Sequence, residues 1–429
     1  MNTYMPKYLL NYLRTRSWSR GSTGGAALVV LVLAAAPIAV QPRLSSAAVA
    51  SPRVNVNVSV SVNVKAKTNV YAATAIGMMS PAASAALARV YAPNVLGRSV
   101  SVIDPATNKV IQTIPTGVYP EHVIVGYDLH SLWIASTRGN TLTRIDPRTG
   151  AVDAPVPVAD PYNVYWTPDG ASMIVIAERF KRLDFLDAKT LKLTASVPLK
   201  CAGANHVDYT ADGKFALVSC EFSSQVFRLD VAARTVTGYL TLRAPADTMQ
   251  HGTRSTTPGR ARRPMRTSMP QDVRLTPDGS AFLVADMMAD GLFVIAADSL
   301  AQIGFIPTGT GAHGIAVGRG GSPFYVANRG WHTVLGGRRG PGSVSVVDPY
   351  TRRVTATWPI PNGGSPDMGN VSADGKTVWF SGRYDDELYA IDTQTGALRA
   401  RIPVGRQPHG VAVWPIPGRY SLGHTGNMR

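Results

Sequence analysis

The sequence predicts an all-β fold, a β-propeller of seven four-stranded blades, and three observations support it. A tight turn with the pattern Thr/Ser-x-Asp-Gly recurs at steps of about 42 residues, as at 167–170 and 210–213, with a longer step of 66 residues to 276–279. A second marker, Ile-Asp-Pro or a variant of it, recurs in register with that turn. The runs between markers are short and rich in Val, Ile, Tyr and Phe, which is typical of strands, and no helical period is visible. Four short strands in a unit of this length indicate a propeller blade.

The two ends of the repeat region predict how the ring closes. Residues 408–415 (PHGVAVWP) repeat the beginning of a blade, but no further strands of that blade follow them. The first strand of the region, 88–94, has the pattern of a second strand, so the first blade lacks its innermost one. We expect 408–415 to fill that place, because this pairing leaves no open sheet edge between the first and last blades. The propeller then spans 89–420, and 421–429 form a C-terminal tail.

The N-terminus has the parts of a secretory signal. Residues 1–25 are basic without an acid, 26–40 are apolar, and small residues stand at 48 and 50. We expect residues 1–50 to be a signal peptide, with an uncleaved N-terminal anchor as the alternative. Residues 51–88 contain the alternating run VNVNVSVSVNV and then Ala/Ser-rich sequence, which indicates a low-complexity linker or an exposed edge strand. The protein is therefore expected outside the cytoplasm, as a secreted, periplasmic or cell-surface monomer.

The charge balance favours anionic partners. The chain carries 43 Lys and Arg against 27 Asp and Glu, a net charge of +16. Removal of residues 1–50 takes away five basic residues and no acidic ones, which leaves +11. Such an excess suits an envelope polymer, a protein or an anionic small molecule. No nucleic-acid-binding module is recognisable, so we expect no nucleic acid partner.

Each innermost strand should begin with a polar residue beside the propeller axis. Strands of a blade alternate in direction, so these residues share one face of the ring, which we call the top face, with the loops between blades. Imidazole and carboxylate groups converging on an axis could bind a metal ion or position water for hydrolysis. Hydrogen bonding to loop carbonyls and water is the simpler alternative. The seven residues are His122, Asn163, His206, Asp272, His313, Asp367 and His409.

Two insertions break the repeat period, and both fall in top-face loops. One spans 244–270 and contains five Arg, and the other spans 328–343. Loops on a rigid scaffold are where binding residues concentrate, although solvated loops without a ligand are the alternative. The expected ligand-binding residues are Asn163, Asp272 and Asp367 of the axial ring, together with top-face loop residues: Arg329, Trp331, His332, Arg338 and Arg339 of the second insertion, and Arg383 of a loop without an insertion.

The two cysteines, Cys201 and Cys220, should come close together on the top face. In an exported protein such a pair indicates a disulfide, and a Cys–Cys–His metal site with His206 is the alternative. The Asp residues of the Ile-Asp-Pro marker lie at turns on the opposite face. They are expected to cap those turns through bonds to the backbone rather than to bind ligands.

Three segments carry a resemblance to a known family: SVSVIDPATNKVIQTIPTG (99–117), GSVSVVDPYTRRVTATWPI (342–360) and PFYVANRG (323–330). They resemble the YVTN-type propeller repeats of secreted and surface-layer bacterial proteins, over roughly residues 89–415. The resemblance implies a propeller related to lactonase-like enzymes and to the propeller domain of nitrous-oxide reductase. In the latter, axial histidines hold copper, but this chain has fewer ring histidines and no second copper domain.

The function expected from the sequence is that of a binding or scaffold module which recognises an envelope component, protein or anionic small ligand with its top face. The alternative is a lactonase-like hydrolase or lyase, or a metal-binding protein, with its site at the channel mouth. Its catalytic candidates and nitrogen ligands are His122, His206, His313 and His409, with Asp272 and Asp367 as further metal ligands. The sequence requires no cofactor and is compatible with a divalent metal ion or copper.

Overall fold

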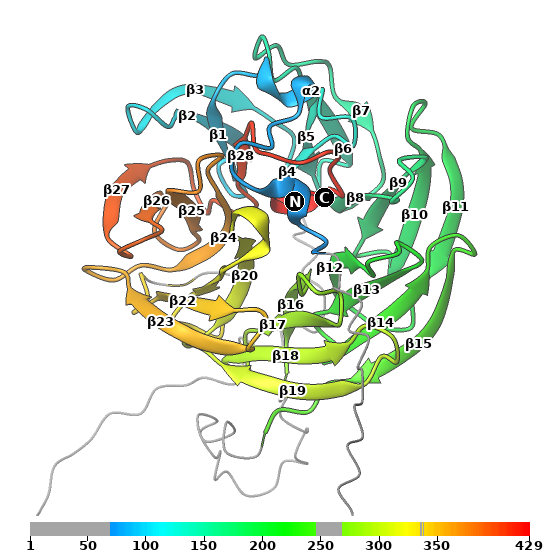
Figure 1. Ribbon diagram of the computed structural model, residues 1–429. Coiled ribbons are helices and arrows are strands. Elements are labelled where there is room, and N and C mark those ends of the chain that lie inside the picture. The colour runs from blue at the N-terminus through cyan, green and yellow to red at the C-terminus, as the bar shows by residue number, and fades with distance from the viewer. Residues whose placement is uncertain (1–68, 246–267, 335–336, 338) are drawn as a thin grey trace, which may run out of the picture. The chain divides into compact units, whose positions relative to one another are not determined.

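The computed structural model describes residues 69–245, 268–334, 337 and 339–429. These residues form seven four-stranded antiparallel sheets that stand around a common axis, so the predicted seven-bladed propeller is confirmed (Figure 1). The predicted turns join first and second strands as expected. In the turn at 167–170, Thr167 Oγ1 bonds to Asp169 Oδ1 at 2.6 Å, and Gly170 has a φ of +69°. That φ is readily adopted by glycine, which explains why Gly ends the motif.

Blades two to seven follow the chain from the axis outward. Blade two contains β4 (Pro120–Val125), β5 (Leu132–Ser136), β6 (Thr141–Ile145) and β7 (Val156–Pro157). Blade three contains β8 (Pro161–Trp166), β9 (Ser172–Ala177), β10 (Arg182–Asp187) and β11 (Leu193–Pro198). Blade four contains β12 (Ala204–Tyr209), β13 (Phe215–Cys220), β14 (Gln225–Asp230) and β15 (Thr235–Thr241).

The remaining three of these blades have the same order. Blade five contains β16 (Pro270–Leu275), β17 (Ala281–Asp286), β18 (Gly291–Ala296) and β19 (Gln302–Pro307). Blade six contains β20 (Ala312–Val317), β21 (Phe324–Asn328), β22 (Ser343–Asp348) and β23 (Arg353–Pro359). Blade seven contains β24 (Pro366–Val371), β25 (Thr377–Gly382), β26 (Glu387–Asp392) and β27 (Leu398–Pro403). Short helices are η1 (Ala72–Thr74), α2 (Pro81–Ser84), η3 (Arg319–Gly321) and η4 (His424–Gly426).

Blade one is completed by the end of the chain, as predicted. Its strand order is β28 (Ala412–Trp414), β1 (Arg89–Asn94), β2 (Ser99–Asp104) and β3 (Lys109–Pro115). β28 pairs with β1 in antiparallel register, with Val413 opposite Val90. The backbone N–H of His409 also donates to the carbonyl of Pro93 at 3.0 Å. The ring is therefore closed by hydrogen bonds between the two ends of the repeat region.

The inner strands of the blades are more buried than the outer strands. Side chains near the axis are therefore shielded from solvent. β4 and β8 are almost entirely buried, whereas β23 alternates between exposed and half-buried residues along its length. The apolar side chains pack between neighbouring blades, as in the cluster that joins Trp414 to Val90 and Ile134. The repeated Asp residues cap their turns as expected: Asp348 Oδ1 accepts from the N–H of Tyr350 at 2.8 Å.

Residues 69–88 differ from the expected linker, because they pack on the face of the ring opposite the top face, which we call the bottom face. The N–H of Val70 donates to the carbonyl of Pro277 at 2.9 Å, and the Tyr71 hydroxyl donates to the carbonyl of Leu275 at 2.9 Å. Tyr71 is 1% exposed. The segment contains none of the repeat markers, but the side chain of Tyr71 packs at the bottom end of the propeller axis. The folded domain therefore begins no later than residue 69, and the alternating run at 54–64 lies outside the described residues.

Residues 421–429 also differ from the expected tail. They fill the axial channel from the bottom face, where the C-terminus and the first described residues meet at the centre of the ring (Figure 1). The N–H of Trp166 donates to the carbonyl of Leu422 at 3.1 Å, and the side chain of Asn427 donates to Asp208 at 3.0 Å. The buried carboxylate of Asp208 also binds Arg429 at 2.6 Å, which fixes the segment. The C-terminal residues are thus a structural part of the propeller.

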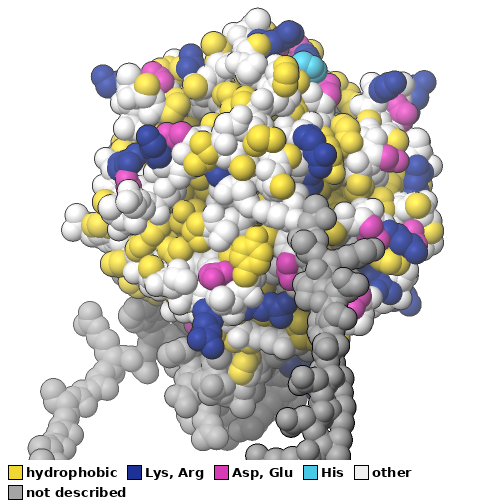
Figure 2. All heavy atoms as spheres, viewed as in Figure 1, with side chains coloured by type: hydrophobic (Ala, Val, Ile, Leu, Met, Phe, Trp, Pro, Cys, Tyr) yellow, Lys and Arg dark blue, Asp and Glu magenta, His cyan; other side chains and the backbone are white. Residues whose placement is uncertain are grey.

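The described residues that are visible on the bottom face form no single charged patch. Figure 2 shows Lys and Arg side chains scattered over this face, with Asp and Glu among them and apolar side chains between. Among the described residues no helix is long and apolar enough to cross a membrane. The predicted signal at 1–50 lies outside the described residues, as does most of the insertion at 244–270.

Candidate functional site

The seven polar residues predicted to begin the innermost strands do surround the axis, and all of them are buried. His122, Asn163, His206, Asp272 and Asp367 are 0% exposed, and His313 and His409 are 2% exposed. An eighth member, His424, comes from η4 at the end of the chain and is also 0% exposed. The repeat pattern does not predict His424, because this residue lies in no repeat. The local signal in the sequence is the nearby Gly423 and Gly426, which adopt positive φ in the structure.

Asp367 holds one half of this cluster together. Its carboxylate lies 2.6 Å from Nδ1 of His409, 2.8 Å from Nδ1 of His313 and 2.7 Å from Nη2 of Arg329. Burial would raise the pKa of Asp367, but these three neighbours hold it well below its usual range. Nη2 of Arg329 also lies 2.8 Å from Nε2 of His313. Both nitrogens of His313 are therefore already bonded, which leaves that ring no lone pair for a ligand.

The other half contains three histidines, His122, His206 and His424. Their ring centroids are 4.9 Å apart for His122 and His424, 4.5 Å for His206 and His424, and 5.9 Å for His122 and His206. One nitrogen of each ring lies within 4.8 Å of the other two. Nε2 of all three is buried and has no hydrogen-bond partner among the described residues. A buried nitrogen without a partner costs about 1–3 kcal/mol, so three together call for an explanation.

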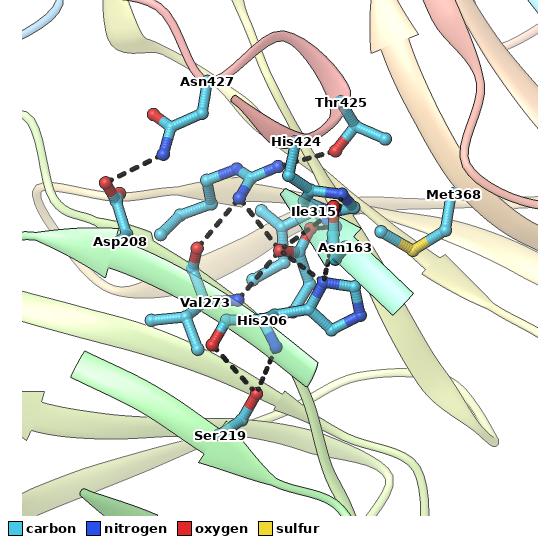
Figure 3. Close-up of polar contacts among 12 residues, drawn as sticks. Asn163, His206, Asp208, Ser219, Val273, Ile315, Met368, His424, Thr425 and Asn427 are labelled. Carbon is cyan, nitrogen blue, oxygen red and sulfur yellow. Dashed lines mark hydrogen bonds and ion pairs between the residues drawn. The ribbon is translucent and has the colours of Figure 1, made fainter. Parts of the chain in front are cut away.

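Neighbouring groups orient these three rings. Nδ1 of His122 lies 2.9 Å from the carbonyl oxygen of Tyr162, so Nδ1 carries the proton and Nε2 has the lone pair. The Nδ2 amide group of Asn163 lies between the other two rings and donates to Nδ1 of His424 at 2.9 Å, and it is 3.5 Å from Nδ1 of His206 (Figure 3). Burial lowers the pKa of His122 to about 3 and the pKa values of His206 and His424 well below the usual range. All three rings are neutral at neutral pH.

Asp272 lies beside this group but is engaged elsewhere. Its Oδ1 is 2.9 Å from Nη1 of Arg274, 3.6 Å from Nε2 of His424 and 4.0 Å from Nδ1 of His206. Its other oxygen accepts from the N–H of Ile315 at 2.9 Å. Asp272 and Asp367 are thus each paired with an arginine and lie outside the three-histidine group.

The top-face mouth above the cluster carries opposed charges. Glu121 and Arg383, from blades two and seven, are 7% and 4% exposed, and Oε2 of Glu121 lies 3.7 Å from Nη1 of Arg383. Oε2 of Glu221 accepts from the Asn205 side chain at 3.4 Å. Burial and then Glu221, Asp160 and Glu121 raise the pKa of Glu178 well above its usual range. Arginines also act on these glutamates: Arg383 and Arg138 on Glu121, and Arg179 on Glu178.

The loop residues predicted to bind ligands are in part already paired within the protein. Arg329 is buried against Asp367, Arg339 pairs with Glu387 at 2.9 Å, and Nε2 of His332 lies 2.7 Å from Asp290. Trp331 is 38% exposed. Arg338 and the arginines of the first insertion lie outside the described residues. The described part of these loops is thus held by internal ion pairs rather than presented as a basic surface.

Cys201 and Cys220 form a disulfide, so the alternative Cys–Cys–His metal site does not form. Replacing both cysteines by alanine should lower the free energy of unfolding by about 3 kcal/mol, because the bond closes a loop between residues 19 positions apart. Urea denaturation with and without reductant measures this effect. Reductant should destabilise the wild type but leave the double variant unchanged; equal curves for both proteins without reductant would contradict the expectation.

Comparison with known proteins agrees with the fold. The sequence profile of the YNCE-like beta-propeller family matches residues 52–187 and 302–417. No curated protein matches the chain. Among solved structures, it is similar to hydrazine synthase of Kuenenia stuttgartiensis, with a TM-score of 0.56, 18% identity and coverage of 78% of this chain and 99% of that one.

Two further structures show the same likeness. A functionally unknown protein of Desulfotomaculum acetoxidans has a TM-score of 0.60 at 14% identity, covering 76% of this chain and 99% of its own. A putative 6-phosphogluconolactonase of Bacteroides uniformis has a TM-score of 0.56 at 16% identity, with the same coverage. Identities this low establish a shared fold rather than a shared activity. The family match covers more than half of the chain and confirms the resemblance to YVTN-type propellers: the chain belongs to the YNCE-like β-propeller family.

Proposed function

We propose that the protein binds one transition-metal ion inside its axial channel, through His122, His206 and His424. The observation that carries this proposal is the convergence of three buried imidazoles, one nitrogen of each within 4.8 Å of the other two, whose Nε2 atoms have no hydrogen-bond partner among the described residues. A metal ion could bind one nitrogen of each ring at once. Neutral nitrogen is also the protonation state that a metal requires.

The donor set limits the metal. Three imidazoles without a thiolate or a carboxylate favour zinc, copper, nickel or iron over calcium and magnesium, which prefer oxygen ligands. The carbonyl of Tyr162 accepts from Nδ1 of His122, which is the contact that the non-ligating nitrogen of a metal-bound histidine normally has. Three protein ligands leave a fourth tetrahedral position for water or a further residue.

The other functions expected from the sequence have less support. A hydrolase or lyase at the mouth would need an accessible imidazole as its base, but the five axial histidines are at most 2% exposed and Asp367 binds two of them. Recognition of an envelope polymer, protein or anionic ligand by top-face arginines stays a prediction, and the internal pairing of Arg329 and Arg339 weakens it. The disulfide favours an oxidising compartment, in keeping with the expected export.

The proposal is tested on the full chain after removal of metal with a chelator. Titration with Zn²⁺, Cu²⁺, Ni²⁺ and Co²⁺ should give one bound ion per chain for at least one of them, by elemental analysis and calorimetry. His206→Ala and His424→Ala should each weaken binding by at least about 100-fold, because each removes a direct ligand. His130→Ala is the matched control, since His130 is exposed in a turn and should bind as the wild type does.

Two outcomes would overturn this assignment. One is a wild-type chain that takes up none of these ions at micromolar concentration. The other is a His206→Ala/His424→Ala double variant that still binds one ion with wild-type affinity. Circular dichroism and thermal melting of each variant separate the loss of a ligand from the loss of the fold.

A further inference from the structure

His424 belongs to a hairpin that is not part of any blade. Residues 419–429 fold back on themselves, and the N–H of Leu422 donates to the carbonyl of Asn427 at 2.7 Å. None of these residues belongs to a strand of the seven sheets. η4 forms the tip of this segment, which we call the C-terminal hairpin, and carries His424 to the axis (Figure 3). The other two histidines of the group lie in β4 and β12. The proposed metal site is therefore assembled from two blade strands and one separate segment.

The three histidines are closed off from solvent in this arrangement. His122, His206 and His424 are each 0% exposed, so an ion from solution reaches them only if part of the protein moves. Moving His122 or His206 would disrupt blade two or blade four, because β4 and β12 are hydrogen-bonded to the next strand of their blade. The C-terminal hairpin can leave the axis while all seven blades keep their four strands. It is therefore the part of the site whose movement disturbs the fold least.

Separate hydrogen bonds, rather than a continuous strand ladder, join the hairpin to the blades. The N–H of Trp166 donates to the carbonyl of Leu422 at 3.1 Å, and Nη2 of Arg274 donates to the Thr425 hydroxyl at 2.9 Å. Thr425 has a φ of +32°, which residues other than glycine seldom adopt. The conformation of the tip thus depends on its contacts in the channel rather than on its own backbone preference.

The base of the hairpin is held by Asp208 and Tyr71. Oδ1 of Asp208 accepts from the side chain of Asn427 at 3.0 Å and from Nη2 of Arg429 at 2.6 Å. The guanidinium of Arg429 lies 4.6 Å from the centre of the Tyr71 ring, and the Tyr71 hydroxyl donates to the carbonyl of Leu275. None of these residues is one of the three histidines. The attachment of the hairpin can therefore be weakened without removal of a metal ligand.

We propose that the C-terminal hairpin is the gate of the metal site: it leaves the axis when an ion enters or leaves, and a bound ion holds it in place through His424. The inference rests on the proposed metal site and adds how that site is opened. Because the ion binds two blade residues and one hairpin residue at once, metal binding and docking of the hairpin stabilise each other. The metal-free protein therefore opens more often than the loaded protein does.

The rate of metal uptake tests the gate. Metal-free full-length protein is mixed with increasing concentrations of Zn²⁺, Cu²⁺, Ni²⁺ or Co²⁺, quenched with EDTA at timed intervals and desalted, and the bound ion is measured by elemental analysis. The uptake rate should level off at high ion concentration, because the opening of the hairpin then limits it. An Asn427→Ala/Arg429→Ala variant should raise this limiting rate at least about tenfold, since it removes both contacts to Asp208.

Release provides the second half of this test. The same double variant should lose its ion to a strong chelator at least about tenfold faster than the wild type, because one opening step serves both directions. Arg339→Ala is the matched control. It removes an arginine ion pair, that with Glu387 at 2.9 Å, from the top face, and it should take up and release the ion at wild-type rates.

Hydrogen exchange tests the coupling in the wild type, and so does not depend on the folding of a variant. The amides of residues 419–429 should exchange at least about tenfold more slowly in the loaded protein than in the metal-free protein, because the ion keeps the hairpin docked. The amides of β26, in the middle of blade seven, should exchange at the same rate in both states.

The results separate the two proposals. If the wild type binds none of the four ions, the metal site itself is refuted. If it binds one ion through His206 and His424, the metal site stands, and the gate is refuted by any of three results: an uptake rate that rises in proportion to ion concentration throughout, wild-type rates in Asn427→Ala/Arg429→Ala, or exchange in 419–429 that the ion does not slow. Faster release without faster uptake would also refute the gate, because it indicates a weakened site rather than a freed hairpin.

Discussion

A chain that ends at residue 407 should not fold into a propeller. This truncation removes β28, which is the innermost strand of blade one, and leaves β1 with an unpaired edge at the axis. It also removes Trp414, which is 1% exposed and belongs to the apolar cluster shared by blades one, two and seven. We expect the truncated chain to be largely insoluble and to show no cooperative thermal transition, by light scattering and circular dichroism.

A second truncation distinguishes ring closure from filling of the channel. A chain that ends at residue 418 keeps β28 but loses η4 and the contacts of Asn427 and Arg429 to Asp208. It should fold with lower stability, and it should bind no metal because His424 is absent. A chain of residues 1–407 that melts cooperatively near the temperature of the full chain would contradict the closure described here.

Asp367→Asn should lower the free energy of unfolding by about 3–5 kcal/mol. The carboxylate accepts from Arg329, His313 and His409, all of which are buried, so the substitution leaves a guanidinium without its counter-charge. The asparagine amide would also point a donor at one of these donors. Urea denaturation measures the change as a shift of the midpoint at constant slope.

The same blade offers a matched control. Asp374→Asn alters a turn aspartate that accepts from Ser372 and from the N–H of Lys376, and its cost should be about 1 kcal/mol or less. Combining Asp367→Asn with Arg329→Met should recover part of the loss, because both members of the buried pair are then neutral. If Asp367→Asn unfolds at the same urea concentration as the wild type, the pair does not carry the stability assigned to it.

The sequence is informative wherever the structure repeats. Turn residues such as Asp169 and Gly170 act through local backbone geometry, so their spacing alone predicts the blades, their number and the position of His122 and His206 at the axis. The unpaired repeat at 408–415 predicts closure for the same reason. The turns depend on residues that are neighbours in the chain, and the closure of the ring depends on the pairing of a single strand.

What the sequence does not predict comes from segments that occur once. Tyr71 and His424 lie outside the repeat, and their positions are set by contacts with inner strands hundreds of residues away, such as that of Asn427 with Asp208. The division of the axial histidines into two groups is equally hidden. It depends on Arg329, a loop residue whose side chain turns inward to Asp367 and His313, and no period in the sequence encodes that direction.

The position of the last strand also fixes when folding can finish. During synthesis the N-terminal domains of a chain generally fold first, and each domain folds as a unit. Here β1 has its axial partner among residues 412–414, and Asp208 has its ligands at 427 and 429. Blades two to seven can be synthesised earlier, but blade one lacks its innermost strand until residues 412–414 have been made. Asp208 likewise lacks its partners until residues 427 and 429 have been made. The native state is therefore reached only after the ribosome has completed this stretch, and the propeller remains incompletely folded until then.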